Sequence, residues 1–197
     1  MKMCFNIKLY GKVYFSMIKN KITDKNIRKD IKEEYKNIMS RAKDIGSNNN
    51  LLGSYTLAAL FIAMNRKDHL SPDENIKILG DGMKKSKLLK ISLGNAKQYV
   101  CEKKCKFRRE WAEETKKRKY ENDWVVDIPV DDKENYGIDY LECGVCKLCN
   151  DEKCPELAKY LCSLDYMLAE LIGLKLTRTM TIANGDPKCD FRYKKPQ

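Results

Sequence analysis

Apolar side chains recur every three or four residues over residues 27–45, which is the period of an amphipathic helix. Thr23 or Asp24 can cap the start of this helix, and Gly46 is a typical stop. Residues 51–64 are apolar almost all round, as expected for a helix surrounded by other elements. The pattern therefore predicts an amphipathic helix packed against a central, buried one.

Two more helices are predicted before the pattern changes. The sequence Ser-Pro-Asp-Glu at residues 71–74 has the form of a capping box with proline at the first helical position, so a helix begins there. A polar helix follows over about residues 95–120. Residues 1–122 are therefore predicted to be mainly helical.

Beyond this helical part the period changes to two, which indicates strands. Apolar and polar residues alternate over 124–130 and again at Ile138 and Tyr140, and the polar residues 131–135 between these runs are typical of a hairpin loop. The cysteine-rich segment that follows is expected to be a loop. It leads to a helix that Pro155 opens and that carries a stripe of leucines.

A second hairpin is predicted near the C-terminus. Residues 174–183 and 188–193 alternate on either side of the turn-forming residues 184–187. The predicted fold class is therefore α+β, with N-terminal helices followed by a ββαββ unit that forms an antiparallel sheet. We expect a single domain over residues 1–197, with the cysteine site in its 123–197 part.

The chain is basic, with 39 Lys and Arg against 28 Asp and Glu and a formal net charge of +11. Much of the excess lies in residues 84–119, where such a run is typical of a solvated helix face, and no nucleic-acid-binding motif accompanies it. The longest apolar run, residues 55–64, is too short to span a bilayer, and lysines interrupt the apolar residues of the N-terminus. We therefore expect a cytoplasmic protein with no membrane and no specific nucleic-acid partner. The sequence leaves the oligomeric state open.

Six of the nine cysteines lie beyond residue 142, and four of them, Cys143, Cys146, Cys149 and Cys154, are closely spaced. In a reducing compartment an odd number of cysteines favours thiols or metal ligands over disulfides. Cys-x-x-Cys spacing is typical of zinc sites, and the four residues nearly match an iron–sulfur run, with one residue too many before the last cysteine. Zinc or an iron–sulfur cluster at these four residues is thus one expectation.

The other expectation is nucleophilic chemistry by a thiolate, which a helix start, a cation or a neighbouring base must stabilise. Glu142 directly precedes Cys143 and can relay a proton. Cys162 and Asp165 lie three residues apart on a predicted helix, so they can face the same cavity. His69 is the only histidine and a candidate base for a Cys/His dyad, and the sequence does not say whether it reaches the cysteines.

The second hairpin brings further residues toward this site. If residues 184–187 close a tight turn, three pairs lie opposite one another: Ile182 and Cys189, Met180 and Phe191, and Arg178 and Tyr193. An arginine in an apolar row needs an anionic partner. Arg178 therefore binds either a ligand carboxylate or a nearby acid, and the residues alone leave both alternatives open.

Four ordered segments of the C-terminal part are similar to one known family. They read Glu142-Cys143, Cys162-Ser-Leu-Asp165-Tyr166, Leu176-Thr-Arg178-Thr-Met-Thr181 and Gly185-Asp186-Pro187-Lys188-Cys189-Asp190-Phe191-Arg192-Tyr193. As a set they resemble the L-2-amino-thiazoline-4-carboxylic acid hydrolase family. The last segment also resembles the vinyl-4-reductase-like ligand-binding domains.

The resemblance implies hydrolytic opening of a small cyclic amidine, a 2-aminothiazoline that carries a carboxylate, toward a carbamoyl-cysteine, and hence a role in cysteine metabolism. Family residues fall on Cys143, Cys162, Asp165, Arg178, Cys189 and Asp190. Glu142 completes the candidate catalytic set, and Tyr166 and Tyr193 join Arg178 as candidate substrate-binding residues. The additional Cys146, Cys149 and Cys154 depart from the family pattern, as an added metal site would.

Three hypotheses follow. The first is a hydrolase that acts on a small carboxylate-bearing substrate through a cysteine-rich site, with either a thiolate or a zinc-bound water as nucleophile. The second is a non-catalytic domain that binds zinc and a small ligand. The third is an iron–sulfur protein.

Overall fold

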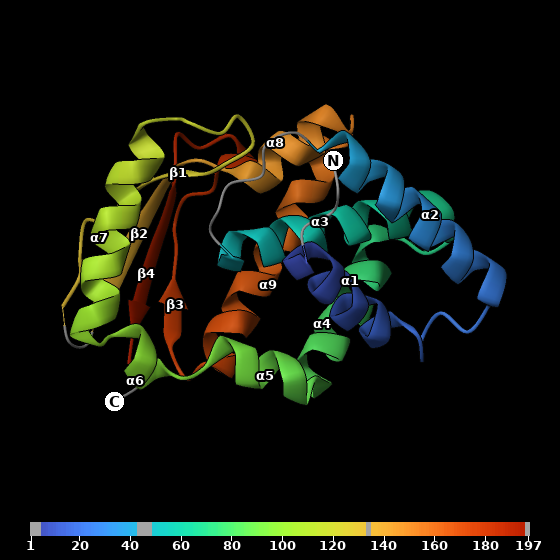
Figure 1. The fold of residues 1–197 in the computed structure, drawn as a ribbon, viewed down its shortest axis with the longest axis horizontal. Helices are drawn as coiled ribbons and strands as arrows, with labels where there is room; N and C mark the ends of the chain where they lie inside the picture. Colours follow the sequence, from blue (N-terminus) through green and yellow to red (C-terminus); the bar gives the residue numbers. More distant parts are fainter. Residues whose placement is uncertain (1–4, 43–48, 133–134, 196–197) are drawn as a thin grey trace.

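A layer of helices packs against one face of a small antiparallel sheet (Figure 1). The computed structural model describes residues 5–42, 49–132 and 135–195. The α-helices are α1 (Phe5–Ile18), α2 (Lys25–Arg41), α3 (Asn49–Lys67), α4 (Pro72–Lys85), α5 (Lys87–Leu93), α6 (Ala96–Tyr99), α7 (Glu102–Lys116), α8 (Gly144–Asp151) and α9 (Ala158–Leu171). The strands are β1 (Val125–Asp127), β2 (Asn135–Glu142), β3 (Lys175–Thr177) and β4 (Cys189–Lys194).

The predicted α+β class is confirmed, and the first helices begin where their caps predict. The Asp24 carboxylate accepts a hydrogen bond from the Asn26 N–H at 2.7 Å, which caps α2. Ser71 and Glu74 form the predicted capping box at the start of α4. The predicted stop at Gly46 lies outside the described residues.

Helix α3 lies at the centre of the helical layer and contacts α1, α2, α4 and α8. Its side chains from Leu57 to Met64 are buried on every face, as the unbroken apolar run predicts. Buried residues of the helices and of the sheet form one continuous hydrophobic core. Within the part of the chain that the structure describes, no helix is both long enough and apolar enough to cross a membrane.

The prediction of one continuous polar helix over residues 95–120 is wrong. Asn95 and Gln98 form a capping box around the single turn α6, and Cys101 then has extended backbone, with φ −76° and ψ 152°, before α7 begins. The interruption is stabilised by a contact across it, because Arg108 Nη1 donates to the carbonyl oxygen of Tyr99 at 2.6 Å. The Tyr99 carbonyl oxygen, at the end of α6, thus accepts a hydrogen bond from a side chain of α7.

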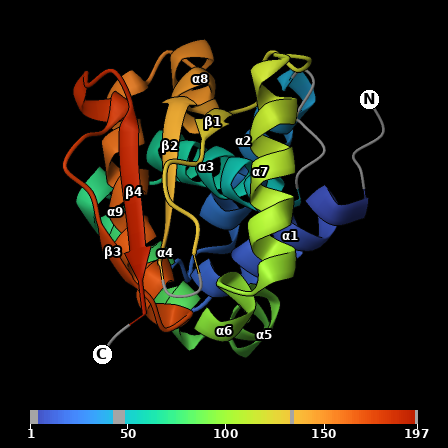
Figure 2. The ribbon, with the colours of Figure 1, turned by 90° about the vertical axis from the view of Figure 1, so that its left-hand side faces the viewer.

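The sheet has the strand order β1-β2-β4-β3, with every pair antiparallel. Figure 2 shows these strands side by side, with α7 next to β1. One face of the sheet turns toward the helical layer and is almost entirely apolar. This inner face carries Val126, Tyr136, Ile138, Tyr140, Leu176, Cys189, Phe191 and Tyr193.

The predicted register of the second hairpin is wrong by two residues. Leu176, not Arg178, lies opposite Tyr193. Strand β3 ends early because the Asp190 carboxylate accepts hydrogen bonds from the N–H groups of Thr179 and Met180, at 2.9 and 2.6 Å. These bonds replace ladder pairing, and residues 182–184 form a short 3-10 helix instead of a strand. A shift of two preserves the side-chain face, so Arg178 still points with the apolar row.

The cysteine-rich segment expected to be a loop is the helix α8. Cys143 is its N-cap residue, and the helix ends at Glu152, which is its C-cap. A short 3-10 helix, Pro155–Leu157, then leads into α9. Only the apolar face of α8, with Leu148 and Cys149, is fully buried.

Candidate functional site

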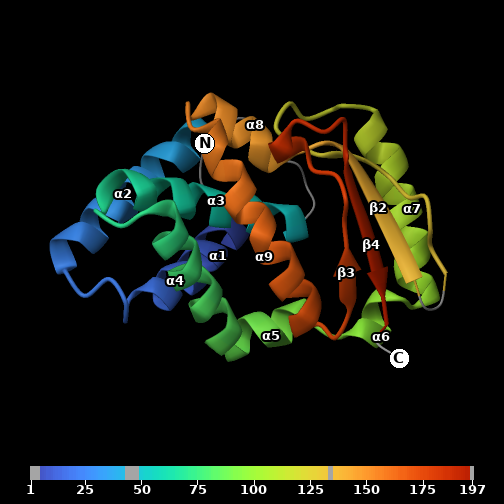
Figure 3. The same ribbon diagram turned by 180° about the vertical axis from the view of Figure 1, so that it is seen from behind.

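A cavity of about 310 Å³ lies between the helical layer and the inner face of the sheet. Figure 3 shows α9 running between α4 and β3, and it contacts both. Residues of α9 form one wall of the cavity. Strands β2 and β4 form the opposite wall. A cavity of this size is large enough for a small organic ligand.

The cavity brings together most of the site residues that the sequence predicts. Cys143 at the start of α8, Cys162 and Asp165 on α9, Arg178 after β3, and Cys189 on β4 all line it. Tyr193 lines it as well. Four elements of the C-terminal part of the chain therefore place three thiols, a carboxylate and a guanidinium around one space.

Arg178 forms an ion pair with Asp165, between Arg178 Nη1 and Asp165 Oδ2 at 2.9 Å. The Arg178 side chain is only 6% exposed, and its Nη2 donates to the Cys162 carbonyl oxygen at 3.2 Å. Its guanidinium carbon lies 4.8 Å from the centre of the Phe191 ring and 5.2 Å from that of Tyr166. The sequence allowed either a ligand carboxylate or a nearby acid as the partner of Arg178. In the structure the partner is an acid, Asp165.

Asp165 is a carboxyl group that titrates close to neutrality. Burial raises its pKa from 3.8 to about 6, and the charge of Arg178 and its hydrogen bond oppose this shift. The pKa of Arg178 is itself raised above its ordinary value, because burial is outweighed by interactions led by the Asp165 charge, so Arg178 stays a cation. A group with a pKa near 6 can both donate and accept a proton at neutral pH.

Cys143 is the thiol most ready to ionise in this cavity. Its pKa is lowered, first by the Cys146 thiol and then by the backbone N–H groups of Cys146 and Val145, whereas burial opposes the shift. Cys143 is the N-cap of α8, where a helix N-terminus favours negative charge. The pKa of Cys146 is raised, chiefly by Cys143, so the shared proton belongs to Cys146.

The two other thiols in the cavity stay protonated. Burial raises the pKa of Cys162 to about 12 and that of Cys189 to about 11. The Ile182 N–H points at Cys189 Sγ, at 3.2 Å, which opposes part of its shift. Of the three cavity thiols, Cys143 is therefore the candidate nucleophile.

Three candidates from the sequence lie elsewhere. The Glu142 carboxylate forms ion pairs with Arg118 at 2.8 Å and Lys147 at 2.6 Å, which lower its pKa, and Glu142 does not line the cavity. Tyr166 is 41% exposed and reaches the site only through its ring contact with Arg178. His69 is exposed after α3 and is not among the residues lining the cavity.

The cysteines of α8 form two thiol pairs rather than a ligand cage. The Cys143 thiol is hydrogen-bonded to that of Cys146. Just beyond the other end of the helix, Cys154 is hydrogen-bonded to Cys149, which lowers the pKa of Cys154 and raises that of Cys149. Among residues 5–42, 49–132 and 135–195, no three His, Cys, Asp or Glu side chains are placed to hold a metal ion. The expected zinc or iron–sulfur site therefore does not fit the geometry of these side chains.

An aromatic wall is the feature that the sequence reasoning missed. Trp111, Trp124, Tyr136 and Tyr140 line the cavity together with the predicted residues. The rings of Tyr140 and Phe191 meet edge to face, 4.9 Å apart. Part of this aromatic wall has a signal in the sequence, because the spacing of Tyr136 and Tyr140 puts both side chains on one face of a strand.

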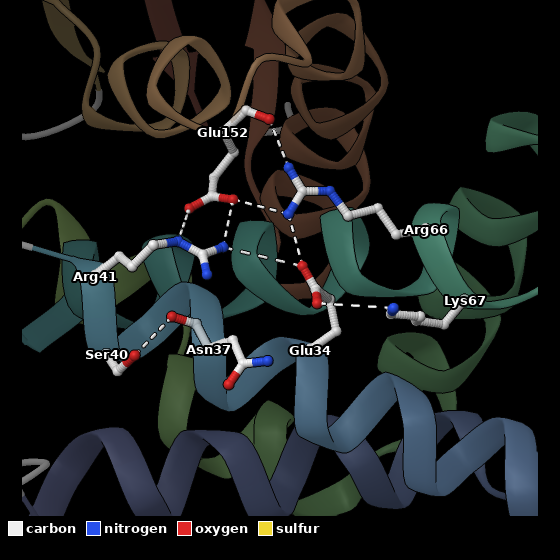
Figure 4. Close-up of polar contacts among 7 residues, drawn as sticks. All are labelled: Glu34, Asn37, Ser40, Arg41, Arg66, Lys67 and Glu152. Atoms are coloured by element: carbon white, nitrogen blue, oxygen red, sulfur yellow. Dashed lines mark hydrogen bonds and ion pairs between the residues drawn. The ribbon is translucent and has the colours of Figure 1, made fainter.

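A cluster of charges fixes the far end of α8 to the helical layer (Figure 4). The Glu152 carboxylate pairs with Arg41 at 2.7 Å and with Arg66 at 2.8 Å. Arg66 also donates to the Glu152 carbonyl oxygen and pairs with Glu34 at 2.7 Å. We call Glu34, Arg41, Arg66 and Glu152 the α8 clamp, because it joins the C-cap of α8 to α2 and α3.

At the other end of α8, the lack of a side chain at Gly144 permits close packing. A Cβ atom there would lie 2.7 Å from the Asn122 carbonyl oxygen and 2.8 Å from the Trp124 ring. Only glycine lets the helix start approach Trp124 this closely. The position of Cys143 at the cavity therefore depends on packing at one end of α8 and on the clamp at the other.

Comparison with known proteins identifies a family. A protein-family model described as L-2-amino-thiazoline-4-carboxylic acid hydrolase matches residues 49–193. This range runs from the start of α3 to Tyr193 in β4, and it includes every residue that lines the cavity except Tyr10 and Tyr14 of α1. Neither the curated proteins nor the solved structures contain a match to the chain.

Proposed function

The chain belongs to the L-2-amino-thiazoline-4-carboxylic acid hydrolase family, and on that basis we propose that it hydrolyses a small cyclic amidine bearing a carboxylate, such as 2-aminothiazoline-4-carboxylate. One observation carries the proposal. A thiol with a lowered pKa, Cys143, lines the same cavity as the buried Asp165–Arg178 pair. In this proposal Cys143 is the nucleophile, Asp165 transfers protons, and Arg178 binds the substrate carboxylate.

Arg178 binds the substrate carboxylate. Its guanidinium carries five N–H donors, and the contacts with Asp165 and the Cys162 carbonyl use one on each of Nη1 and Nη2. Among the described residues no other hydrogen bond uses the remaining donors, so they can take a second anion. Because the arginine is held by these contacts and by the Phe191 ring, it orients the substrate without first having to be ordered itself.

The first step is attack by Cys143. Its thiolate forms a bond to the amidine carbon, ring carbon 2, and the bond from that carbon to the ring nitrogen breaks. The nitrogen leaves as an amine with one proton from Asp165 and one from the exocyclic amino group. The product of this step is an imidodithiocarbonate that links Cys143 to the substrate sulfur.

The second step is hydrolysis of this covalent intermediate. Water attacks the same carbon, the imide nitrogen takes one of its protons, and the Asp165 carboxylate takes the other. The bond to Cys143 breaks and restores its thiolate. The released product is S-carbamoyl-cysteine, and Asp165 is again protonated for the next turnover.

Replacement of the nucleophile tests the mechanism. Cys143→Ser is expected to lower the rate of carbamoyl-cysteine formation from 2-aminothiazoline-4-carboxylate by about a hundredfold or more, because a serine hydroxyl ionises far less readily than a thiol. Formation of product is followed by mass spectrometry. Wild-type protein quenched early in the reaction should carry one substrate molecule attached at Cys143.

The matched control is Cys101→Ser, since Cys101 is exposed and does not line the cavity. It should turn over like the wild-type protein. Full activity of Cys143→Ser, with circular dichroism showing an intact fold, would rule out attack by this thiol.

A further inference from the structure

The lining of the cavity extends well beyond the size of a 2-aminothiazoline carboxylate. Its lining follows β2 from Tyr136 to Tyr140 and continues to Cys143. At the rise of a strand, Tyr136 and Cys143 lie roughly 20 Å apart along the chain. Covalent bonds are about 1.3–1.5 Å long, so a five-membered ring with an amino group and a carboxylate spans only about 6–7 Å. A substrate held between Cys143 and Arg178 therefore leaves the other end unfilled.

That other end, which we call the distal section, is aromatic. It is lined by Leu93, Tyr99, Phe107, Trp111, Tyr136 and Tyr193. Tyr136 stacks on Tyr193 with ring centres 4.4 Å apart and on Tyr99 at 6.3 Å. Such a wall favours a flat apolar group, because aromatic rings gain from stacked and edge contacts beyond the burial of their area.

Two cationic side chains lie near the distal section, and each contacts one of its aromatic rings. Arg108 is buried, pairs with Asp131, and lies over the Tyr136 ring at 4.3 Å. Lys104 is exposed, and its ammonium lies 5.5 Å from the centre of the Phe107 ring. An anionic group at this end would have to compete with Asp131, so an uncharged ligand group suits it better.

We infer that the ligand of this cavity is a cyclic amidine carboxylate with an aromatic substituent on ring carbon 5, and that this substituent occupies the distal section. The inference rests on the proposed function for its reactive end. Ring carbon 2 must face Cys143 and the carboxylate on carbon 4 must face Arg178. Carbon 5, beside carbon 4 and away from carbon 2, is then the position open toward the distal section.

Binding can be measured without any turnover. The probes are 2-aminothiazole-4-carboxylate and its 5-benzyl derivative, because a fully aromatic thiazole keeps the ring and carboxylate but is not an amidine that opens in this reaction. Titration calorimetry on the full chain should give a Kd for the benzyl derivative at least tenfold lower than for the parent probe. Equal affinities would overturn the inference.

Two variants of α5 locate the extra affinity. Leu93→Trp fills the distal section and should remove most of the tenfold gain, while the Kd of the parent probe changes less than twofold. Leu88→Trp is the matched control on the same helix, because Leu88 is 56% exposed and does not line the cavity. A gain that persists in Leu93→Trp would place the benzyl group elsewhere and also overturn the inference.

Turnover of the corresponding thiazolines separates this inference from the proposed function. If the family reaction occurs, the 5-benzyl thiazoline should have the higher kcat/KM. Hydrolysis of the parent compound with no advantage of the benzyl group in binding or in rate defeats the inference alone. Tighter binding of the benzyl probe with no hydrolysis of either thiazoline defeats the proposed function alone.

Discussion

At the scale of single residues, the reactivity of the site depends on where one proton resides. Cys143 and Cys146 share it, and the helix start together with the Cys146 thiol holds the pKa of Cys143 low. Both residues belong to a Cys-x-x-Cys spacing that the sequence also allowed as a metal site. The structure places them at the N-cap and third position of a helix, where the second thiol can donate to the first.

Removal of Cys146 should therefore make Cys143 less reactive. In Cys146→Ala the pKa of Cys143 rises, because its largest stabilising contact is lost. The rate of Cys143 alkylation by iodoacetamide near pH 7, followed by peptide mass spectrometry, should fall severalfold. Cys101→Ala, at an exposed site, should leave that rate unchanged. Unchanged alkylation in Cys146→Ala would show that the helix start alone stabilises the thiolate.

Asp165 should control the basic limb of the pH dependence of activity. Its pKa is about 6, and the first step needs its proton for the leaving ring nitrogen, so kcat/KM is expected to fall as the pH rises above this value. In Arg178→Gln the cation that lowers this pKa is removed, so the Asp165 titration should move to higher pH.

Nuclear magnetic resonance of the Asp165 carboxyl carbon measures this shift even if Arg178→Gln is inactive. The control is Arg192→Gln, whose arginine pairs with Asp139 on the outer face of the sheet and does not line the cavity. An Asp165 pKa that stays the same in Arg178→Gln would mean that burial alone sets it.

At the scale of elements, α8 is the helix on which the site depends. It runs only from Gly144 to Asp151, and a helix this short is not stable by itself in water. The α8 clamp and the packing of Gly144 against Trp124 hold its two ends. The sequence predicts a loop here, and the partners that fix the helix, Arg41 and Arg66, come from helices about 100 positions away in the chain.

Glu152→Gln should destabilise the protein by about 1–3 kcal/mol, because two arginines lose their shared carboxylate. Urea unfolding at pH 7 measures this loss. The matched control is Glu114→Gln, which breaks an exposed pair with Lys117 and should change stability by less than about 0.5 kcal/mol. If both changes had equally small effects on stability, the α8 clamp would not be what holds this end of α8.

The same carboxylate predicts how the clamp responds to pH. The pKa of Glu152 is lowered in the folded protein, because its bonds to Arg41 and Arg66 outweigh burial. The folded state then binds fewer protons than the unfolded state in this range, so the stabilisation is present above the ordinary glutamate pKa of about 4.3 and is lost as the pH falls through the lower folded value. The difference between wild type and Glu152→Gln should shrink on acidification, and a constant difference would contradict it.

At the scale of the whole molecule, helices and sheet share one hydrophobic core, with the cavity between them. We therefore propose that residues 1–197 unfold as a single domain. Near-ultraviolet circular dichroism, which reports Trp111 and Trp124 beside the cavity, should give the same urea midpoint as far-ultraviolet dichroism, which is dominated by the helices. Separate midpoints would divide the chain into two units.

The family match covers most of this domain. Residues 49–193 match the family and include both walls of the cavity, α9 and the β2–β4 pair. The residues quoted for the resemblance lie only in the second half of the chain. The helical half contributes the central α3 and the arginines of the clamp rather than reactive groups.

The sequence by itself determined the elements whose signals are local. The caps at Asp24 and Ser71, the apolar α3 and the alternation in β2 each act within a turn of helix or along one strand, so they can be recognised without knowing their neighbours. The sequence also determined the face on which Arg178 lies, because a register shift of two residues leaves each side chain on the same face of the sheet.

The tertiary structure alone decided which groups meet. It paired Arg178 with Asp165, set Glu142 in ion pairs away from the cavity, and turned the cysteine segment into α8 with Cys143 at its start. These outcomes depend on contacts between residues distant in the chain, such as Arg66 with Glu152, and on burial that only packing produces. A pKa or a partner that arises from such contacts has no local signal in the sequence.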